Sequence, residues 1–133
     1  MVQSNIMQDR LQELFPVHYR NGNILMINAD CMEVMKHIKE KEAELSCVDP
    51  PYGIGEDGGK CRTRGSKNTN GEKKSWDKEK PDEKYFNELR RVSKNQIIWG
   101  GNYFSDILPA SRCWIYWQKD MGGDFADGEL AWT

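Results

Sequence analysis

The chain has 133 residues, of which 38% are hydrophobic and 30% charged, with a formal net charge of −2. This length fits one small domain with its own core. No apolar run is long enough to span a bilayer, and residues 1–5 lack the basic and apolar regions of a signal peptide. The composition argues against a membrane-spanning chain and a protein that coats nucleic acid non-specifically. We expect a cytoplasmic protein.

Four cysteines are present, at positions 31, 47, 61 and 113, and they form no C-x-x-C pair. Neither histidine stands at metal-ligand spacing from another ligand type, so we predict no metal site. Cys47 and Cys113 fall in strand-like runs and are predicted to be small buried side chains. We interpret the thiols as reduced and non-catalytic.

Helical and strand-like segments alternate along the chain. The expected elements are a helix at 1–15, a turn at 21–23, a strand at 24–28, a helix at 31–41, a strand at 45–48, a long loop at 53–80, a helix at 81–94, a strand at 96–99, a short helix at 103–108, a strand at 113–117 and a final strand from 129. The continuous apolar run at 24–28 is typical of a buried parallel strand. This alternation predicts an α/β fold with a mostly parallel sheet. We expect Trp99, Trp114 and Trp117 in its core.

Polar or flexible residues follow three of the predicted strands, namely Asp30, Asp49 and the Gly-Gly-Asn run at 100–102. Ligands bind at the C-terminal ends of the strands in a parallel sheet. We therefore expect these residues to line one rim. Asp30 is also a candidate N-cap for the following helix, and the two roles are compatible.

The run Asp49-Pro50-Pro51-Tyr52 suits the binding of an amine on an aromatic ring. Such an amine is a poor nucleophile because its lone pair is delocalised into the ring. The Asp49 carboxylate and the Pro50 carbonyl could accept hydrogen bonds from its two N–H groups and draw the nitrogen toward a tetrahedral shape. Proline keeps the corner rigid, and Tyr52 offers a stacking surface for a base turned out of a duplex. The alternative is an ordinary Asp-Pro-Pro turn with a packed tyrosine.

The chain resembles the DNA N6-adenine/N4-cytosine methyltransferases of bacteria and phages, which include restriction-modification enzymes. The resemblance is to the arrangement in which the catalytic motif precedes the cofactor glycine loop. Five ordered matches from residue 24 onward carry it, at 28–35, 49–54, 91–95 together with 99–104, 117–120 and 129–133.

The resemblance implies a Rossmann-like methyltransferase sheet, S-adenosylmethionine as cofactor and double-stranded DNA with a flipped base as substrate. The catalytic residues would be Asp49, Pro50, Pro51 and Tyr52, of which Asp49 and Pro50 would hold the target amine and Tyr52 would stack on the base. Asp30 would lie against the adenine of the cofactor, with Asp49 also at the cofactor site. Aspartate at the start of the motif favours adenine N6, and cytosine N4 is the alternative.

The chain departs from the family in one respect, because it lacks the Phe-x-Gly-x-Gly loop that meets the methionine part of the cofactor. We therefore expect residues 1–133 to form a single partial catalytic domain whose sheet lacks the glycine-loop strand. The missing C-terminal half or a second copy is a candidate partner, and the isolated chain is expected not to methylate DNA. The alternative function is a DNA-binding or regulatory module without catalysis.

A basic loop, at about 53–80, directly follows the motif. Residues 58–80 hold eight basic and three acidic side chains, so this segment is +5 and the rest of the chain is −7. A basic loop on an acidic body fits local contact with phosphates. Our hypothesis is that Arg62, Arg64 and Lys67 contact DNA, and the alternative is a solvated loop without a partner.

Overall fold

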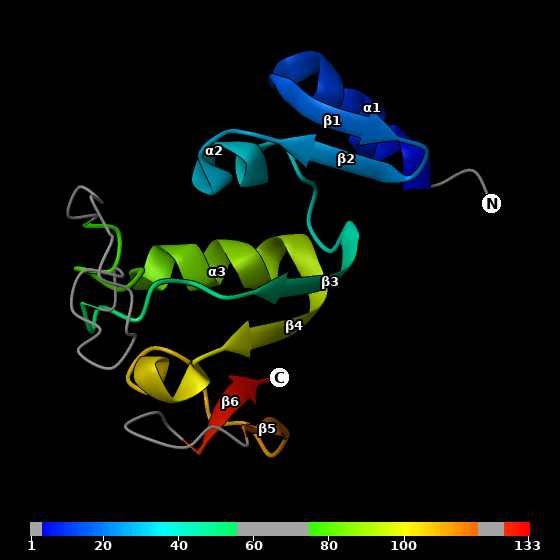
Figure 1. The fold of residues 1–133 in the computed structure, drawn as a ribbon. Helices are drawn as coiled ribbons and strands as arrows, with labels where there is room; N and C mark the ends of the chain where they lie inside the picture. The colour runs from blue at the N-terminus through cyan, green and yellow to red at the C-terminus, as the bar shows by residue number, and fades with distance from the viewer. Residues whose placement is uncertain (1–3, 56–74, 120–126) are drawn as a thin grey trace.

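A computed structural model describes residues 4–55, 75–119 and 127–133. Its elements in chain order are α1 (Ser4–Leu14), β1 (Val17–Asn21), β2 (Ile24–Ile27), α2 (Cys31–Lys36), β3 (Ala43–Val48), α3 (Glu83–Val92), β4 (Ser93–Trp99), the 3-10 helix η1 (Gly101–Phe104), β5 (Trp114–Gln118) and β6 (Gly128–Trp132). Figure 1 shows α1, β1 and β2 at one end of the molecule and β5 and β6 at the other. Within the described ranges, no helix is both long and apolar enough to cross a membrane.

The main sheet has four strands in the order β3-β4-β6-β5. β3 and β4 pair in parallel, whereas β6 runs antiparallel to both β4 and β5. The α/β class is therefore right, but the expectation of a mostly parallel, Rossmann-like sheet is wrong. Loop length gives the physical reason for β6. Nine residues separate β5 from β6, and a parallel crossover needs a dozen or more, so β6 returns as the partner of a hairpin.

The strand expected at 24–28 forms, as β2, but it is neither parallel nor buried. It pairs antiparallel with β1 in a separate two-stranded sheet, with Asn21 opposite Ile24. The two-residue turn between the strands is Gly22-Asn23, where Gly22 takes a positive φ of 51°, and a Gly-Asn pair between two strands is a hairpin signal. Ile24 is 57% exposed and Met26 51%. Pairing with β1 provides backbone hydrogen bonds for β2, so this strand does not need a crossover to the main sheet.

One face of α3 supplies much of the core. Phe86, Leu89 and Val92 are buried and pack with Ile98 of β4. Their spacing is that of an amphipathic helix with its apolar side inward. The N-terminus of α3 is capped by the Asp82 side chain. These contacts fix α3 against the strand that leads into η1.

Arg91 joins α2 to α3. Its guanidinium donates to the carbonyl of Met35 at 2.7 Å and to that of Ile38 at 2.8 Å. The Met35 carbonyl lies at the C-terminal end of α2 and also accepts the amide of Ile38, whereas the Ile38 carbonyl lies just beyond the helix. The Glu88 carboxylate accepts from the same guanidinium, and this hydrogen bond holds the pKa of Glu88 below its ordinary value. The contact positions α2 beside the sheet unit.

The edge strand β5 is exposed along its whole length. Trp114 is 42% exposed and Trp117 54%, so the prediction that both lie in the core is wrong. Trp99 is half-buried and meets Trp117 edge-on. Cys47 and Cys113 are also exposed, against expectation. An edge strand has a neighbour on one side only, which explains the exposure of β5 and of Cys47 on the opposite edge strand, β3.

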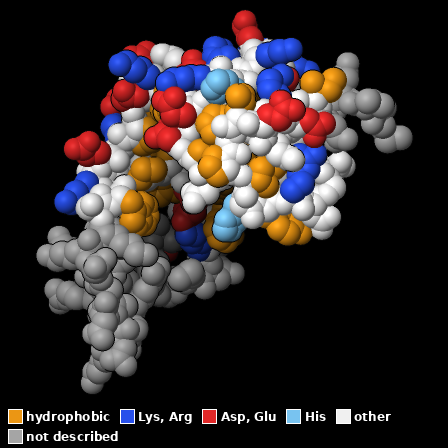
Figure 2. Space-filling model, turned by 90° about the horizontal axis from the view of Figure 1, so that it is seen from above, with side chains coloured by type: hydrophobic (Ala, Val, Ile, Leu, Met, Phe, Trp, Pro, Cys, Tyr) orange, Lys and Arg blue, Asp and Glu red, His pale blue; other side chains and the backbone are white. Residues whose placement is uncertain are grey.

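The surface around the N-terminal elements mixes charges of both signs. Figure 2 shows Lys and Arg interspersed with Asp and Glu along the upper rim, with apolar side chains between them. Ion pairs such as Arg20–Asp9 and Lys36–Glu33 connect neighbouring charges there. Phosphate binding requires basic side chains gathered in one place. This face therefore does not have the charge pattern of a nucleic-acid surface.

Candidate functional site

The 49–52 motif lies at the C-terminal edge of the parallel pair. Asp49 directly follows β3, and Gly100 directly follows β4. Because Val48 lies opposite Ile98 in the parallel register, both chains leave the sheet at the same edge. Asp49 is exposed and Pro50 is buried. The rigid proline therefore anchors the corner while the carboxylate remains accessible.

Tyr52 is held by contacts at both its hydroxyl and its ring. The hydroxyl donates to Oδ1 of Asp49 at 2.6 Å. The ring stacks on Tyr103, with centroids 4.7 Å apart and planes 14° from parallel, and meets Phe104 edge-on. Burial raises the pKa of Tyr52, and the hydrogen bond to Asp49 raises it further. The phenol therefore stays neutral and keeps its proton for donation to Asp49.

Gly100 leaves the space that the Tyr52 ring occupies. Its φ is +67°, and a Cβ built on it would lie 2.1 Å from Cε1 of Tyr52. Its amide also donates to the carbonyl of Leu130 at 2.9 Å, which ties the start of η1 to β6. The sequence pattern correctly places residues 100–102 beside the motif. It does not predict the ring against Gly100 or the stacking partner, Tyr103.

Asp77 holds the backbone that follows the motif. It is 2% exposed, and its Oδ1 accepts the amide of Gly53 at 2.8 Å. Its own carbonyl accepts the amide of Gly55 at 3.0 Å. Sequence reasoning counts Asp77 only as one acid in the basic loop. A lone aspartate in a charged run is almost always exposed, so the sequence carries little signal for this role.

Lys80 connects the same region to η1. Its ammonium contacts both carboxylate oxygens of Asp106, at 2.7 and 2.8 Å, and donates to the carbonyl of Tyr103 at 3.3 Å. The hydrogen bond from Lys80 holds the pKa of Asp106 below its ordinary value. Lys80 therefore neutralises the Asp106 carboxylate, and it supports the backbone of Tyr103.

Asp30 does not belong to the same rim. It follows β2, which lies outside the main sheet. Its carboxylate caps α2, accepting the amides of Met32 at 2.7 Å and Glu33 at 3.4 Å. The predicted N-cap is therefore confirmed, and the expectation that Asp30 and Asp49 end strands of one sheet is wrong. Arg62, Arg64 and Lys67 lie outside the described residues.

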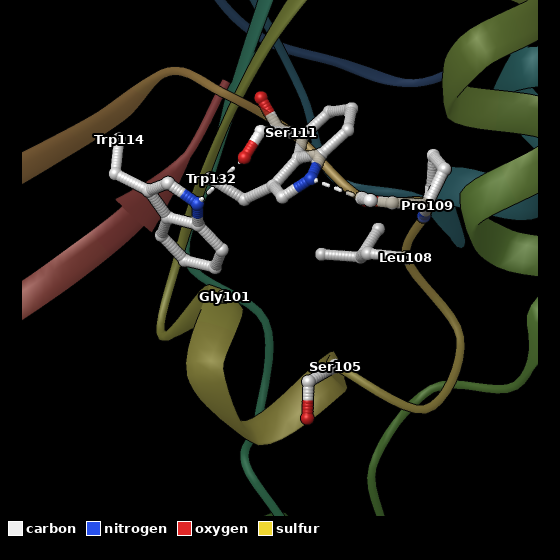
Figure 3. Close-up of a pocket in the computed structure, with 8 residues that line it drawn as sticks. Gly101, Ser105, Leu108, Pro109, Ser111, Trp114 and Trp132 are labelled. Carbon is white, nitrogen blue, oxygen red and sulfur yellow. Dashed lines mark hydrogen bonds between the residues drawn. The ribbon is translucent and has the colours of Figure 1, made fainter.

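A pocket of about 260 Å³ lies beside η1 (Figure 3). Its lining residues are Gly101, Ser105, Leu108, Pro109, Ala110, Ser111, Trp114 and Trp132. The indole N–H of Trp114 donates to the carbonyl of Ser111, and that of Trp132 to the carbonyl of Pro109. No charged side chain lines this pocket, so it offers no charged partner for the ammonium and carboxylate of S-adenosylmethionine. Neither Asp30 nor Asp49 lines it.

Comparison of the chain with protein families, with curated proteins and with solved structures found no match. The chemical groups at the site come from three side chains and one backbone carbonyl. An accessible carboxylate at Asp49 adjoins the Pro50 carbonyl, and the paired rings of Tyr52 and Tyr103 lie beside them. Two acceptors next to an aromatic surface can bind a planar ring that carries an amino group.

Proposed function

We propose that residues 49–52 bind the exocyclic amino group of a DNA base during methyl transfer from S-adenosylmethionine, with adenine N6 as the target. The observation that carries the proposal is the accessible Asp49 carboxylate, which is oriented by the Tyr52 hydroxyl at the end of β3. The buried Pro50 next to it gives the second acceptor a fixed position.

In this proposal the acceptors act on the nitrogen of the base. One oxygen of Asp49 accepts from Tyr52, and we assign the other oxygen to one N–H of the amine. The Pro50 carbonyl accepts the second N–H. Both acceptors stabilise the positive charge that develops on the nitrogen as its lone pair forms the new bond. When bound, S-adenosylmethionine would supply an electrophilic methyl group on a sulfonium, whose methyl–sulfur bond breaks as the methyl–nitrogen bond forms, and the nitrogen then loses one proton to solvent.

The aromatic surface is a pair of rings. One face of Tyr52 is already covered by Tyr103, which is itself 40% exposed. We therefore propose that the base stacks against this pair, with Tyr103 sharing the role first assigned to Tyr52. Offset stacking of a base on an aromatic side chain contributes about 1–3 kcal/mol.

The proposed substrate is double-stranded DNA in the cytoplasm, with the target base turned out of the stack. Arg62, Arg64 and Lys67 remain the proposed phosphate contacts. Each phosphate contact adds about 0.9 to the slope of log affinity against log salt. Replacing all three by glutamine should therefore lower the slope by about 2–3. An unchanged slope would remove these residues from the proposal.

The test of the reaction is transfer of labelled methyl groups from S-adenosylmethionine to DNA by this chain assembled with the C-terminal half that would supply the glycine loop, with the product base identified after digestion. We expect N6-methyladenine. Asp49→Ala should lower the rate by about 100-fold or more, because a preorganised acceptor is lost, while salt-dependent DNA binding stays unchanged. N4-methylcytosine would change the target base. An Asp49→Ala variant as active as the wild type would sink the proposal.

A further inference from the structure

We infer that Asp77 is a positioning residue that holds the amine-binding corner in its working shape. This inference rests on the function proposed for residues 49–52. Asp77 lies 24 positions after the residue that it binds, and only 2% of it is exposed. A buried carboxylate is costly unless hydrogen bonds compensate for its lost hydration. The hydrogen bond from the Gly53 amide to this carboxylate is one of the interactions that compensate for its burial.

The first of these bonds acts on the peptide unit next to Tyr52. Oδ1 of Asp77 accepts the amide of Gly53 at 2.8 Å. Because a peptide unit is planar, fixing this amide also fixes the carbonyl of Tyr52. The direction of the backbone that carries the Tyr52 ring is therefore set partly by Asp77.

The second bond acts two residues further on. The carbonyl of Asp77 accepts the amide of Gly55 at 3.0 Å. Gly53 and Gly55 have positive φ angles of 73° and 75°, and glycine loses more conformational freedom on folding than any other residue. Residue 77 thus holds both glycines, Gly53 through its side chain and Gly55 through its backbone. Gly53 also packs closely, since a Cβ there would lie 3.0 Å from the Lys80 amide.

Three contacts of Tyr52 depend on this backbone direction. They are the hydrogen bond to Asp49, the stack on Tyr103 and the close approach to Gly100. If the backbone after Tyr52 relaxes, the Asp49 carboxylate loses the hydroxyl that orients it. Small displacements of positioned groups cost large factors in rate. Asp77 therefore acts on the reaction through Tyr52 and Asp49, without touching the base.

Two substitutions separate a positioning role from a general contribution to stability. Asp77→Ala removes the acceptor, whereas Asp77→Asn keeps an oxygen that can accept the Gly53 amide. The matched control is Ser93→Ala. Ser93 is 0% exposed, bonds to the Leu89 carbonyl at 2.7 Å and begins β4, at the opposite end of that strand from Gly100. This control loses a buried hydrogen bond remote from the corner.

The first measurement is amide hydrogen exchange of Gly53 by NMR in the full-length protein, compared with the global stability of each variant. We expect Asp77→Ala to speed exchange at Gly53 about tenfold or more beyond its effect on global stability. Asp77→Asn should retain most of the protection, and Ser93→Ala should change Gly53 only through global stability. Should Asp77→Ala fail to fold, the Asn variant and Ser93→Ala still decide the matter. Wild-type exchange at Gly53 as fast as in an unprotected glycine, or loss of its protection in Asp77→Asn, would overturn the inference.

The second measurement is the rate of methyl transfer by the same assembly with the C-terminal half, with DNA affinity measured separately. We expect Asp77→Ala to lower kcat about tenfold or more with unchanged DNA affinity, and Asp77→Asn to restore it to within about threefold. Equal kcat in wild type and Asp77→Ala overturns the positioning role. Absence of methyl transfer by the wild type counts against the proposed function instead, and the exchange at Gly53 still tests the hold of Asp77 on the corner.

Discussion

The conformation of Gly100 decides whether Tyr52 can lie where it does. Gly100 combines a positive φ with a ring packed against its Cα, whereas Gly22 has a positive φ of 51° and nothing within 4 Å of a Cβ. A side chain at Gly22 would therefore meet only backbone strain, whereas one at Gly100 would meet the same strain and also a clash with the Tyr52 ring. Asp49, Tyr52 and Gly100 form one unit in which each position depends on the other two.

We predict that Gly100→Ala destabilises the protein by more than Gly22→Ala. Both substitutions impose strain of about 1 kcal/mol at a positive φ, and Gly100→Ala adds overpacking of about 1–3 kcal/mol. Urea unfolding gives the two values, and the tyrosine bands of the near-ultraviolet circular dichroism spectrum report the Tyr52–Tyr103 stack. We expect that signal to change only in Gly100→Ala. Equal losses of stability with unchanged spectra would show that the ring is not packed against Gly100.

At the scale of elements, α2 is a short helix that depends on its ends. Asp30 caps its N-terminus, and the Arg91 guanidinium accounts for two carbonyls near its C-terminus. A helix of six residues has little stability of its own, since isolated helices below about 12 residues are marginal in water. The cap of Asp30 is therefore a structural role, which exists whether or not this carboxylate also meets a cofactor.

Substitution of Asp30 separates these two roles. Asparagine caps a helix about as well as aspartate, whereas alanine loses about 1 kcal/mol. We expect Asp30→Asn to unfold at nearly the wild-type urea concentration and Asp30→Ala to unfold earlier. If Asp30 also contacts S-adenosylmethionine, both variants should bind the cofactor more weakly by isothermal titration calorimetry. If Asp30→Asn binds the cofactor as tightly as the wild type, the only role of Asp30 is to cap α2.

At the scale of the whole molecule, the main sheet has two different edges. β5 carries Trp114, Ile115, Tyr116 and Trp117, all between 37% and 59% exposed, and no charged side chain. The other edge strand, β3, includes Glu44 and one exposed large apolar residue, Leu45. Natural sheets usually protect their edges with charges, and an exposed apolar edge strand invites pairing with another chain. β5 is therefore the edge at which we expect self-association.

We predict that Ile115→Lys reduces concentration-dependent association of the purified protein, measured by sedimentation velocity. A lysine on the edge strand opposes pairing because its charge would have to be desolvated. The matched control is Leu45→Lys, which places the same charge on the β3 edge and should leave association unchanged. The reverse pattern would place the association at β3, and a wild type that stays monomeric at all concentrations would contradict the prediction.

The sequence by itself determined most of the elements and the position of the motif. The apolar spacing predicted α3 and the strands β3 and β4, and the order of segments placed Asp49 and residues 100–102 at neighbouring strand ends, where the structure has them. These predictions succeed because helix and strand periodicity depends on residues only a few positions apart.

Only the tertiary structure decided the direction of strand pairing and the contacts that hold the motif. The two-residue turn at Gly22 and Asn23 made β2 the partner of β1, and the short connection after β5 reversed β6. Asp77 reaches Gly53 across 24 positions, and Tyr103 stacks on Tyr52 from a separate element. Such contacts arise from loop closure and packing between distant segments, which leave no periodic pattern in a single sequence. The motif indicated a chemistry, and the fold supplied the residues that hold it in place.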